Sequence, residues 1–134
     1  MVAVSLKKFF FFKQKTAYEI QWCDWSSDVC SSDLNIAANY GGRDEIVNAA
    51  RLAAENGEEI NEENLSKHMY TSASPDPDLI VRTAGEMRLS NFLLWQCAYS
   101  EFYCTSVLWP DLTPEDIDRA VIDFSSRKRK YGKI

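Results

Sequence analysis

The stretch DLIVRTAGEMRLSNFLLWQCAYSEFYCTSVLW, residues 78–109, decides the fold. It contains two short apolar runs rich in β-branched and aromatic residues, Asp78–Thr83 and Phe102–Trp109, which are typical of strands. Between them, Ser90 can cap a helix that runs from Asn91 to about Tyr99. A strand, a helix and a second strand in succession indicate parallel strands joined by a covering helix.

The same alternation continues on both sides of this stretch. We predict a strand at residues 35–40, a helix at 43–55, and a second helix from 62 to about 69 that Asn61 caps. A final helix follows Thr113, its N-cap. The apolar positions of the first helix are Ile46, Val47, Ala50 and Ala54. The sequence therefore predicts an α/β fold with a mostly parallel sheet flanked by helices.

Length and composition restrict the class of protein. The 134 residues suffice for one domain, and 46% hydrophobic with 26% charged residues is ordinary globular composition. The net charge of −5 argues against a general nucleic-acid-binding surface. No apolar run reaches the roughly 18–20 residues of a membrane helix. Four irregularly spaced cysteines do not suggest a disulfide scaffold or zinc site. We expect a cytoplasmic protein.

Residues 1–34 differ from the rest of the chain. Residues 9–34 show neither helical nor alternating periodicity. Within them, KQKTAYEI (13–20) and DWSSDVCSSDL (24–34) resemble the translated arms of a sequencing-library adapter. We interpret residues 1–34 as an artefactual leader, unstructured or irregular; the alternative is a genuine but disordered leader. Acidic and basic residues are equal in number there, so the whole net charge lies on residues 35–134.

The segment after the first strand of the deciding stretch has the features of a phosphate site. Arg82 lies at the carboxyl end of that strand, the edge where open parallel sheets bind ligands. Arg88 and Ser90 follow at the start of the predicted helix, so two guanidiniums, a hydroxyl and free N–H groups are available to an anion. The alternative is that the arginines pair with Glu86 or nearby aspartates. Spacing alone does not decide between the two.

Glu101 is a lone carboxylate within an otherwise apolar run. Such a group is costly to bury unless it is paired or binds a metal. Mg²⁺ commonly takes one or two carboxylates together with substrate phosphate oxygens. A carboxylate that faces solvent at the start of a strand explains Glu101 equally well.

Other chemically active residues have simpler explanations. His68 stands alone and reads as a solvated histidine on a helix. Cys97 and Cys104 read as buried small hydrophobic residues. Residues 92–95 are expected in the core, with the lining of a tunnel as the alternative.

Three segments together carry a resemblance to a known family: NIAANYGGR (35–43), DPDLIVRTAGEMRLSNFLLWQCAYSEFY (76–103) and VLWPD (107–111). They resemble the carboxyl-terminal half of a cis-prenyltransferase, the family of isoprenyl transferase and undecaprenyl diphosphate synthase. On this resemblance, residues 35–134 form a partial cis-prenyltransferase domain.

The resemblance implies an activity. Members condense isopentenyl diphosphate onto an allylic diphosphate such as farnesyl diphosphate, with Mg²⁺, and make a cis-polyprenyl diphosphate such as undecaprenyl diphosphate, the lipid carrier of peptidoglycan synthesis. By family pattern, Arg82, Arg88, Leu89 and Ser90 bind substrate, and Glu101 contributes to the metal site from within the chain or across a homodimer. Peripheral membrane association through the lipid product is also implied.

Three departures from the family pattern limit this expectation. The family's amino-terminal half, with its metal-binding aspartate, is absent, so we expect no catalytic residue here and no activity of the chain alone. Met87 stands where some members have histidine, and Lys130-Tyr131-Gly132 replaces an Arg-x-Gly ending. The alternatives are a non-catalytic partner subunit or a diphosphate-binding fragment.

Overall fold

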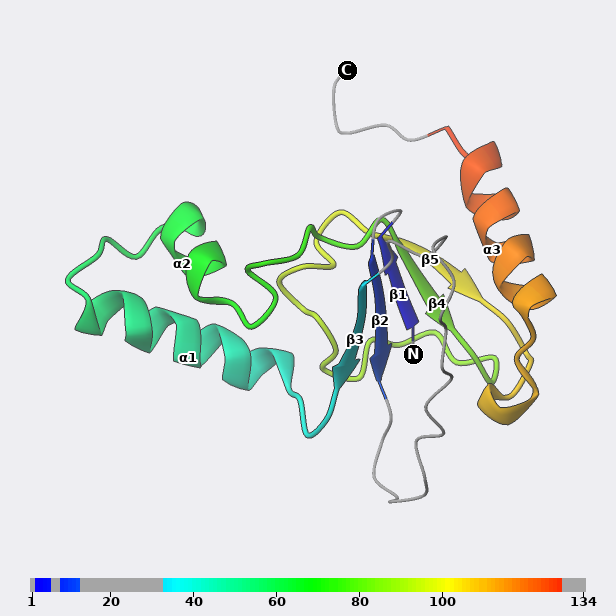
Figure 1. Ribbon diagram of the computed structural model, residues 1–134, viewed down its shortest axis with the longest axis horizontal. Coiled ribbons are helices and arrows are strands. Elements are labelled where there is room, and N and C mark those ends of the chain that lie inside the picture. Colours follow the sequence, from blue (N-terminus) through cyan, green and yellow to red (C-terminus); the bar gives the residue numbers. More distant parts are fainter. Residues whose placement is uncertain (1, 6–7, 13–32, 129–134) are drawn as a thin grey trace.

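The computed structural model describes residues 2–5, 8–12 and 33–128. In chain order, its elements are β1 (Val2–Ser5), β2 (Lys8–Phe12), β3 (Asp33–Ala37), α1 (Gly42–Glu55), α2 (Glu62–His68), β4 (Leu79–Arg82), β5 (Glu101–Cys104), the 3₁₀ helix η1 (Trp109–Asp111) and α3 (Pro114–Ser126). The strands form one sheet in the order β3-β2-β1-β4-β5. Figure 1 shows α3 beside β5, whereas α1 and α2 extend from the other side of the sheet, past β3.

The predicted α/β class is confirmed. β4 pairs with β5 in parallel, and so does β2 with β3. The sheet also has an antiparallel member that the sequence did not suggest, because β1 runs antiparallel to both β2 and β4.

The expectation that the stretch before Asn35 is irregular is wrong for three short segments, one of which is the start of β3 at Asp33 and Leu34. Val2–Ser5 and Lys8–Phe12 are strands, and β1 pairs along β4 with Val2 opposite Val81 and Val4 opposite Leu79. Valine and phenylalanine have high strand propensity, and pairing satisfies the edge of β4. Residues 13–32, which hold most of the adapter-like sequence, lie outside the described residues.

β4 is the centre of the core because both of its faces are covered. Ile80 packs against three buried residues of the segment that follows the next loop: Phe92, Leu93 and Cys97. Leu79 and Val81 point to the opposite face, where they meet Ala120 of α3. This alternation is the period of two expected for a strand.

The helix predicted at residues 43–55 is confirmed as α1, but its buried face is not the predicted one. Glu45, Ala49 and Ala53 are fully buried, whereas Val47 is 68% exposed. These buried positions are four residues apart and form one stripe, and α1 packs chiefly against α2.

The predicted helix caps are present. Asn61 Oδ1 accepts a hydrogen bond from the backbone N–H of Asn64 at 2.9 Å at the start of α2. Thr113 and Asp116 form a capping box at the start of α3, each side chain accepting from the other's backbone N–H.

The helix predicted from Asn91 to about Tyr99 is wrong, because this segment consists of turns. Ser90, Asn91 and Leu93 have left-handed φ values of 49°, 64° and 46°. The Asn91 carbonyl accepts from Gly42 N at 2.8 Å, and its Oδ1 accepts from Arg43 N at 2.9 Å. Asn91 therefore caps the first turn of α1, a tertiary role that local helix signals do not reveal. The strand predicted at 102–109 is also shorter and ends at Cys104.

Candidate functional site

The candidate site lies where β4 ends at Arg82 and the chain enters a loop. Ala84 N donates to Val107 O at 2.9 Å, and Gly85 N donates to Thr105 O at 2.8 Å. Both residues have left-handed φ, 63° and 66°. These bonds hold the start of the loop against the segment after β5.

The two predicted arginines converge on one carboxylate. Arg82 Nη2 donates to Oε2 of Glu86, and Arg88 Nη2 donates to Oε1 of the same group. Arg82 is the anchored member, with its side chain 13% exposed, whereas that of Arg88 is 62% exposed. The hydrogen bond from Arg82 is the main reason that the pKa of the Glu86 carboxyl lies below its usual range. The ion pairing weighed as an alternative in the sequence is therefore present, and it brings two cations to one anion.

Arg82 has a donor that Glu86 does not satisfy. Its Nε is buried and has no hydrogen-bond partner among the described residues. Nε and Nη2 form one edge of the guanidinium, the edge that binds a carboxylate or phosphate with two hydrogen bonds. The edge is therefore only half used.

Leu89 and Ser90 have different surroundings. Leu89 is partly buried and packs against the cluster around Ile80. Ser90 is exposed and stands at the start of turns rather than of a helix. The expected contribution of a helix N-terminus at Ser90 is therefore wrong, although the hydroxyl follows Arg88 closely in the chain.

Glu101 lies at the other end of the strand pair. In the parallel register Glu101 is opposite Leu79, whereas Arg82 is opposite Cys104. A strand rises about 3.3 Å per residue, so Glu101 and Arg82 are roughly 10 Å apart along the strands. Glu101 Oε2 accepts from Arg127 Nη1 at 3.0 Å. Within the described residues, no three histidine, cysteine, aspartate or glutamate side chains gather as a metal site would require.

A buried polar network surrounds Glu45 and was not predicted from the sequence. Glu45 of α1 is 0% exposed, and it accepts from Tyr40 Oη, from Tyr70 N at 2.8 Å and from Gln96 Nε2 at 3.1 Å. Burial, with Glu45 adding to it, raises the pKa of Tyr40. The spacing of Glu45 four residues before Ala49 was the available signal, since it places the carboxylate in the small-residue stripe of α1.

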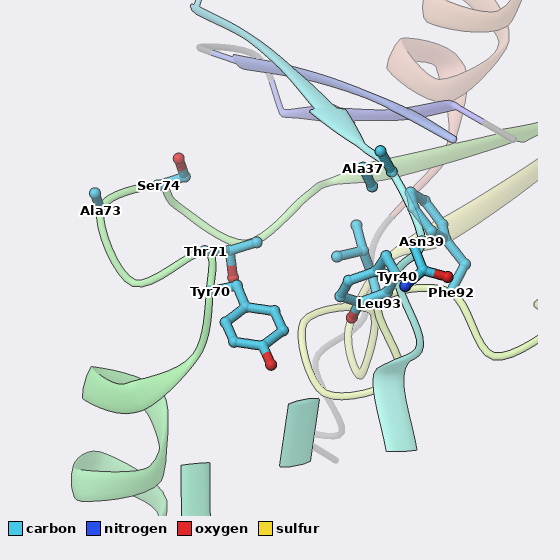
Figure 2. Close-up of a pocket in the computed structure, with 10 residues that line it drawn as sticks. Ala37, Asn39, Tyr40, Tyr70, Thr71, Ala73, Ser74, Phe92 and Leu93 are labelled. Atoms are coloured by element: carbon cyan, nitrogen blue, oxygen red, sulfur yellow. The ribbon is translucent and has the colours of Figure 1, made fainter. Parts of the chain in front are cut away.

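A cavity of about 340 Å³ lies beside this network. Figure 2 shows Tyr70 and Thr71 on one side and Tyr40, Phe92 and Leu93 on the other. Phe92 and Leu93 are core residues, as predicted, and also form a wall of the cavity.

Two of the simpler expectations are corrected. His68 is not solvated, because its side chain is 17% exposed and Nε2 lies 2.9 Å from Glu58 Oε2. Cys97 is buried as predicted, and burial raises the pKa of its thiol to about 12. Cys104, in contrast, is exposed. On the short strand β5, Phe102 and Cys104 are the exposed residues, alternating with half-buried Glu101 and Tyr103.

In the part of the chain that the structure describes, no helix combines the length and apolar character needed to cross a membrane.

Comparison with known proteins gives consistent matches. A family model described as "Putative undecaprenyl diphosphate synthase" matches residues 10–132. The isoprenyl transferase of Fusobacterium nucleatum is 54% identical over 102 residues, which cover 75% of this chain and 44% of that protein. The isoprenyl transferase of Aquifex aeolicus is 49% identical over 110 residues, which cover 81% and 48%.

Solved structures agree in fold. A crystal structure of a "probable undecaprenyl diphosphate synthase" from Campylobacter jejuni has a TM-score of 0.71 and 42% identity, and the match covers 78% of this chain and 49% of that one. Lavandulyl diphosphate synthase from Lavandula x intermedia, in complex with dimethylallyl diphosphate, has a TM-score of 0.71 and 39% identity over 76% and 47%. The chain spans less than half the length of these relatives. It nevertheless matches the family along most of its own sequence, and it therefore belongs to the undecaprenyl diphosphate synthase, or isoprenyl transferase, family.

Proposed function

We propose that this chain is the diphosphate-binding, carboxyl-terminal portion of a cis-prenyltransferase. The whole enzyme would condense isopentenyl diphosphate onto an allylic diphosphate such as farnesyl diphosphate and release a cis-polyprenyl diphosphate such as undecaprenyl diphosphate, a lipid carrier for peptidoglycan. The observation that carries the proposal is the convergence of Arg82 and Arg88 on a single anion.

In this proposal the arginines hold the diphosphate of isopentenyl diphosphate. Arg82 is held in place by burial and offers a two-donor edge, whereas exposed Arg88 can adjust to the second phosphate. Ser90 adds a hydroxyl donor, and Leu89 fixes the backbone between Arg88 and Ser90 through its contact with the core. In this role the four groups bind and orient substrate and do not form or break a bond, and we expect no condensation by the chain alone.

The described residues do not fit a Mg²⁺ site by themselves. Glu101 is the one carboxylate that we assigned to a metal; it is paired with Arg127 and lies at the end of β5 remote from Arg82. Mg²⁺ needs further oxygen ligands, which substrate phosphates commonly supply. We therefore assign Glu101 to a Mg²⁺ site only as one member of a set completed outside these residues. Nothing in the proposal for Arg82 and Arg88 depends on the ion.

The position of Glu101 supports a homodimer. Because one chain keeps Glu101 and Arg82 at opposite ends of the β4–β5 pair, a site that uses both needs Glu101 from a second copy. We also propose that the enzyme is cytoplasmic and touches the membrane only peripherally, through its lipid product.

The test is binding of isopentenyl diphosphate by isothermal titration calorimetry. Replacing Arg82 by glutamine removes charge-assisted hydrogen bonds worth about 1.5–3 kcal/mol each, so the dissociation constant should rise by at least about tenfold. Arg51→Gln is the matched control, because Arg51 forms a similar i,i+4 pair with Glu55 on exposed α1. The proposal fails if Arg82→Gln binds isopentenyl diphosphate as tightly as the parent while circular dichroism shows both are folded.

A further inference from the structure

Glu86 occupies the place that an anionic ligand would take between the two arginines. Each of its carboxylate oxygens accepts from a different guanidinium. In this bridging position the carboxylate does not reach Arg82 Nε, the neighbouring donor on the edge where Oε2 is bound, and Nε has no partner among the described residues. Glu86 therefore satisfies this pair of arginines only in part.

A diphosphate has the oxygens that Glu86 lacks. One phosphate can accept from both Nε and Nη2 of Arg82, and the other can accept from Arg88. The same two arginines would then be satisfied with no buried donor left unpaired. The diphosphate would take the Arg82 Nη2 donor that Glu86 holds, and its negative charge repels the carboxylate that lies between the two guanidiniums. Glu86 and a diphosphate therefore compete for this position.

The structure allows Glu86 to leave. Its side chain is 33% exposed, so the carboxylate can turn into water. The loop is anchored one residue earlier, by the hydrogen bonds of Ala84 and Gly85 to residues 107 and 105. Withdrawal of the carboxylate consequently needs side-chain rotation and leaves the position of Arg82 unchanged.

We propose that Glu86 is a resident anion, which neutralises Arg82 and Arg88 in the empty site and is displaced when a diphosphate binds. This inference rests on the proposed function, since it assigns the regulation of the same site. When the ligand departs, Glu86 returns and re-forms both ion pairs. Its presence lowers the affinity for diphosphate and so favours release.

Calorimetric titration with inorganic diphosphate tests this role. Glu86→Gln keeps the shape of the side chain but removes the competing charge, so it should bind inorganic diphosphate roughly three- to tenfold more tightly than the parent. The matched control is Glu55→Gln on α1, whose carboxylate pairs with Arg51 far from the site; its affinity should equal that of the parent. The gain should disappear in the double variant Arg82→Gln/Glu86→Gln.

The outcomes separate this inference from the proposed function. If Arg82→Gln weakens binding and Glu86→Gln also weakens it or leaves it unchanged, the diphosphate site stands and the resident-anion role is overturned. Glu86 would then be a fixed clamp that orients the arginines. If Arg82→Gln binds isopentenyl diphosphate and inorganic diphosphate as tightly as the parent does, the proposed function fails and this inference fails with it. The NMR signal of Arg82 Nε–H gives a second, independent readout: it should shift downfield on addition of inorganic diphosphate, because this donor then gains a hydrogen bond, and an unchanged signal would contradict the proposal.

Discussion

Glu45 offers the sharpest test of how this chain is held together. Glu45 is 0% exposed, and its carboxylate accepts from three neutral donors: Tyr40 Oη, Tyr70 N and Gln96 Nε2. These donors come from three separate parts of the chain, before α1, after α2 and within the turns at 90–99. Glu45 therefore ties together segments that have few other polar contacts in common.

The expected effect of Glu45→Ala follows from the donors it would strand. Tyr40 is half-buried and can turn towards water, and Gln96 keeps a 2.8 Å bond to Thr71 Oγ1. The Tyr70 N–H and one Gln96 N–H lose charge-assisted bonds worth about 1.5–3 kcal/mol each, partly offset because the buried charge is removed as well. We expect the free energy of unfolding to fall by about 3 kcal/mol, a large part of the roughly 5–15 kcal/mol typical of a domain.

Urea denaturation followed by circular dichroism measures this loss. Glu55→Ala is the matched control, because Glu55 lies on the same helix but its side chain is 56% exposed, and its surface pair contributes about 0–1 kcal/mol. Glu45→Gln should lie between the two variants, since the amide keeps an acceptor but turns a donor towards other donors. If the free energies of unfolding of Glu45→Ala and Glu55→Ala differ by less than about 0.5 kcal/mol, the network does not stabilise the fold and this reasoning is refuted.

Two further predictions concern α3 and the cysteines. Hydrogen bonds donated by the backbone N–H and the hydroxyl of Thr113 hold the pKa of the Asp116 carboxyl below its usual range. The ionised carboxylate therefore contributes its full stabilisation above the ordinary aspartate pKa, and this contribution is lost as the pH falls through the lower pKa of the folded state. The urea midpoint of the parent should therefore fall more steeply below about pH 4 than that of Asp116→Asn, and equal slopes would contradict the prediction. Iodoacetamide at about pH 8 should alkylate exposed Cys104 and spare Cys97, because burial raises the pKa of the Cys97 thiol to about 12. Peptide mass spectrometry distinguishes the two sites, and rapid modification of Cys97 in the folded chain would show that it is not buried.

The elements that could be predicted from the sequence are those with local signals. α2 and α3 begin at the predicted residues, because Asn61 and Thr113 are caps whose hydrogen bonds involve residues only three positions away. α1 begins one residue before its predicted start and has no side-chain cap of its own. β4 was identified because its apolar run is short and bounded by turn residues. The family resemblance likewise depended on contiguous motifs.

The features that could not be predicted depend on partners distant in the chain. Left-handed φ values at Ser90, Asn91 and Leu93 prevent a helix there, and Asn91 caps α1 instead. No sequence pattern within residues 90–99 predicts this role, because the partner is a distant helix. The buried stripe of α1 is decided by contacts with distant parts of the chain. Glu45 faces inwards, where Tyr40, Tyr70 and Gln96 donate to it, and Val47 faces outwards. Local propensity gave the helix but not its orientation.

The same distinction applies to the candidate site. Arg82 and Arg88 were identified from residue type and position, but their arrangement depends on β4 and on a segment whose structure differs from the prediction. The period of two along β4 places Arg82 on the face of Ile80, the face that Phe92 and Leu93 cover, and not on the face covered by α3. Leu89 packs into that same cluster, so the core on this face also fixes the backbone beside Arg88 and Ser90. Contacts between the turns at 90–99 and β4 therefore hold the end of the loop that carries the proposed diphosphate site, whereas α3 stabilises the strand from behind without touching the site's face.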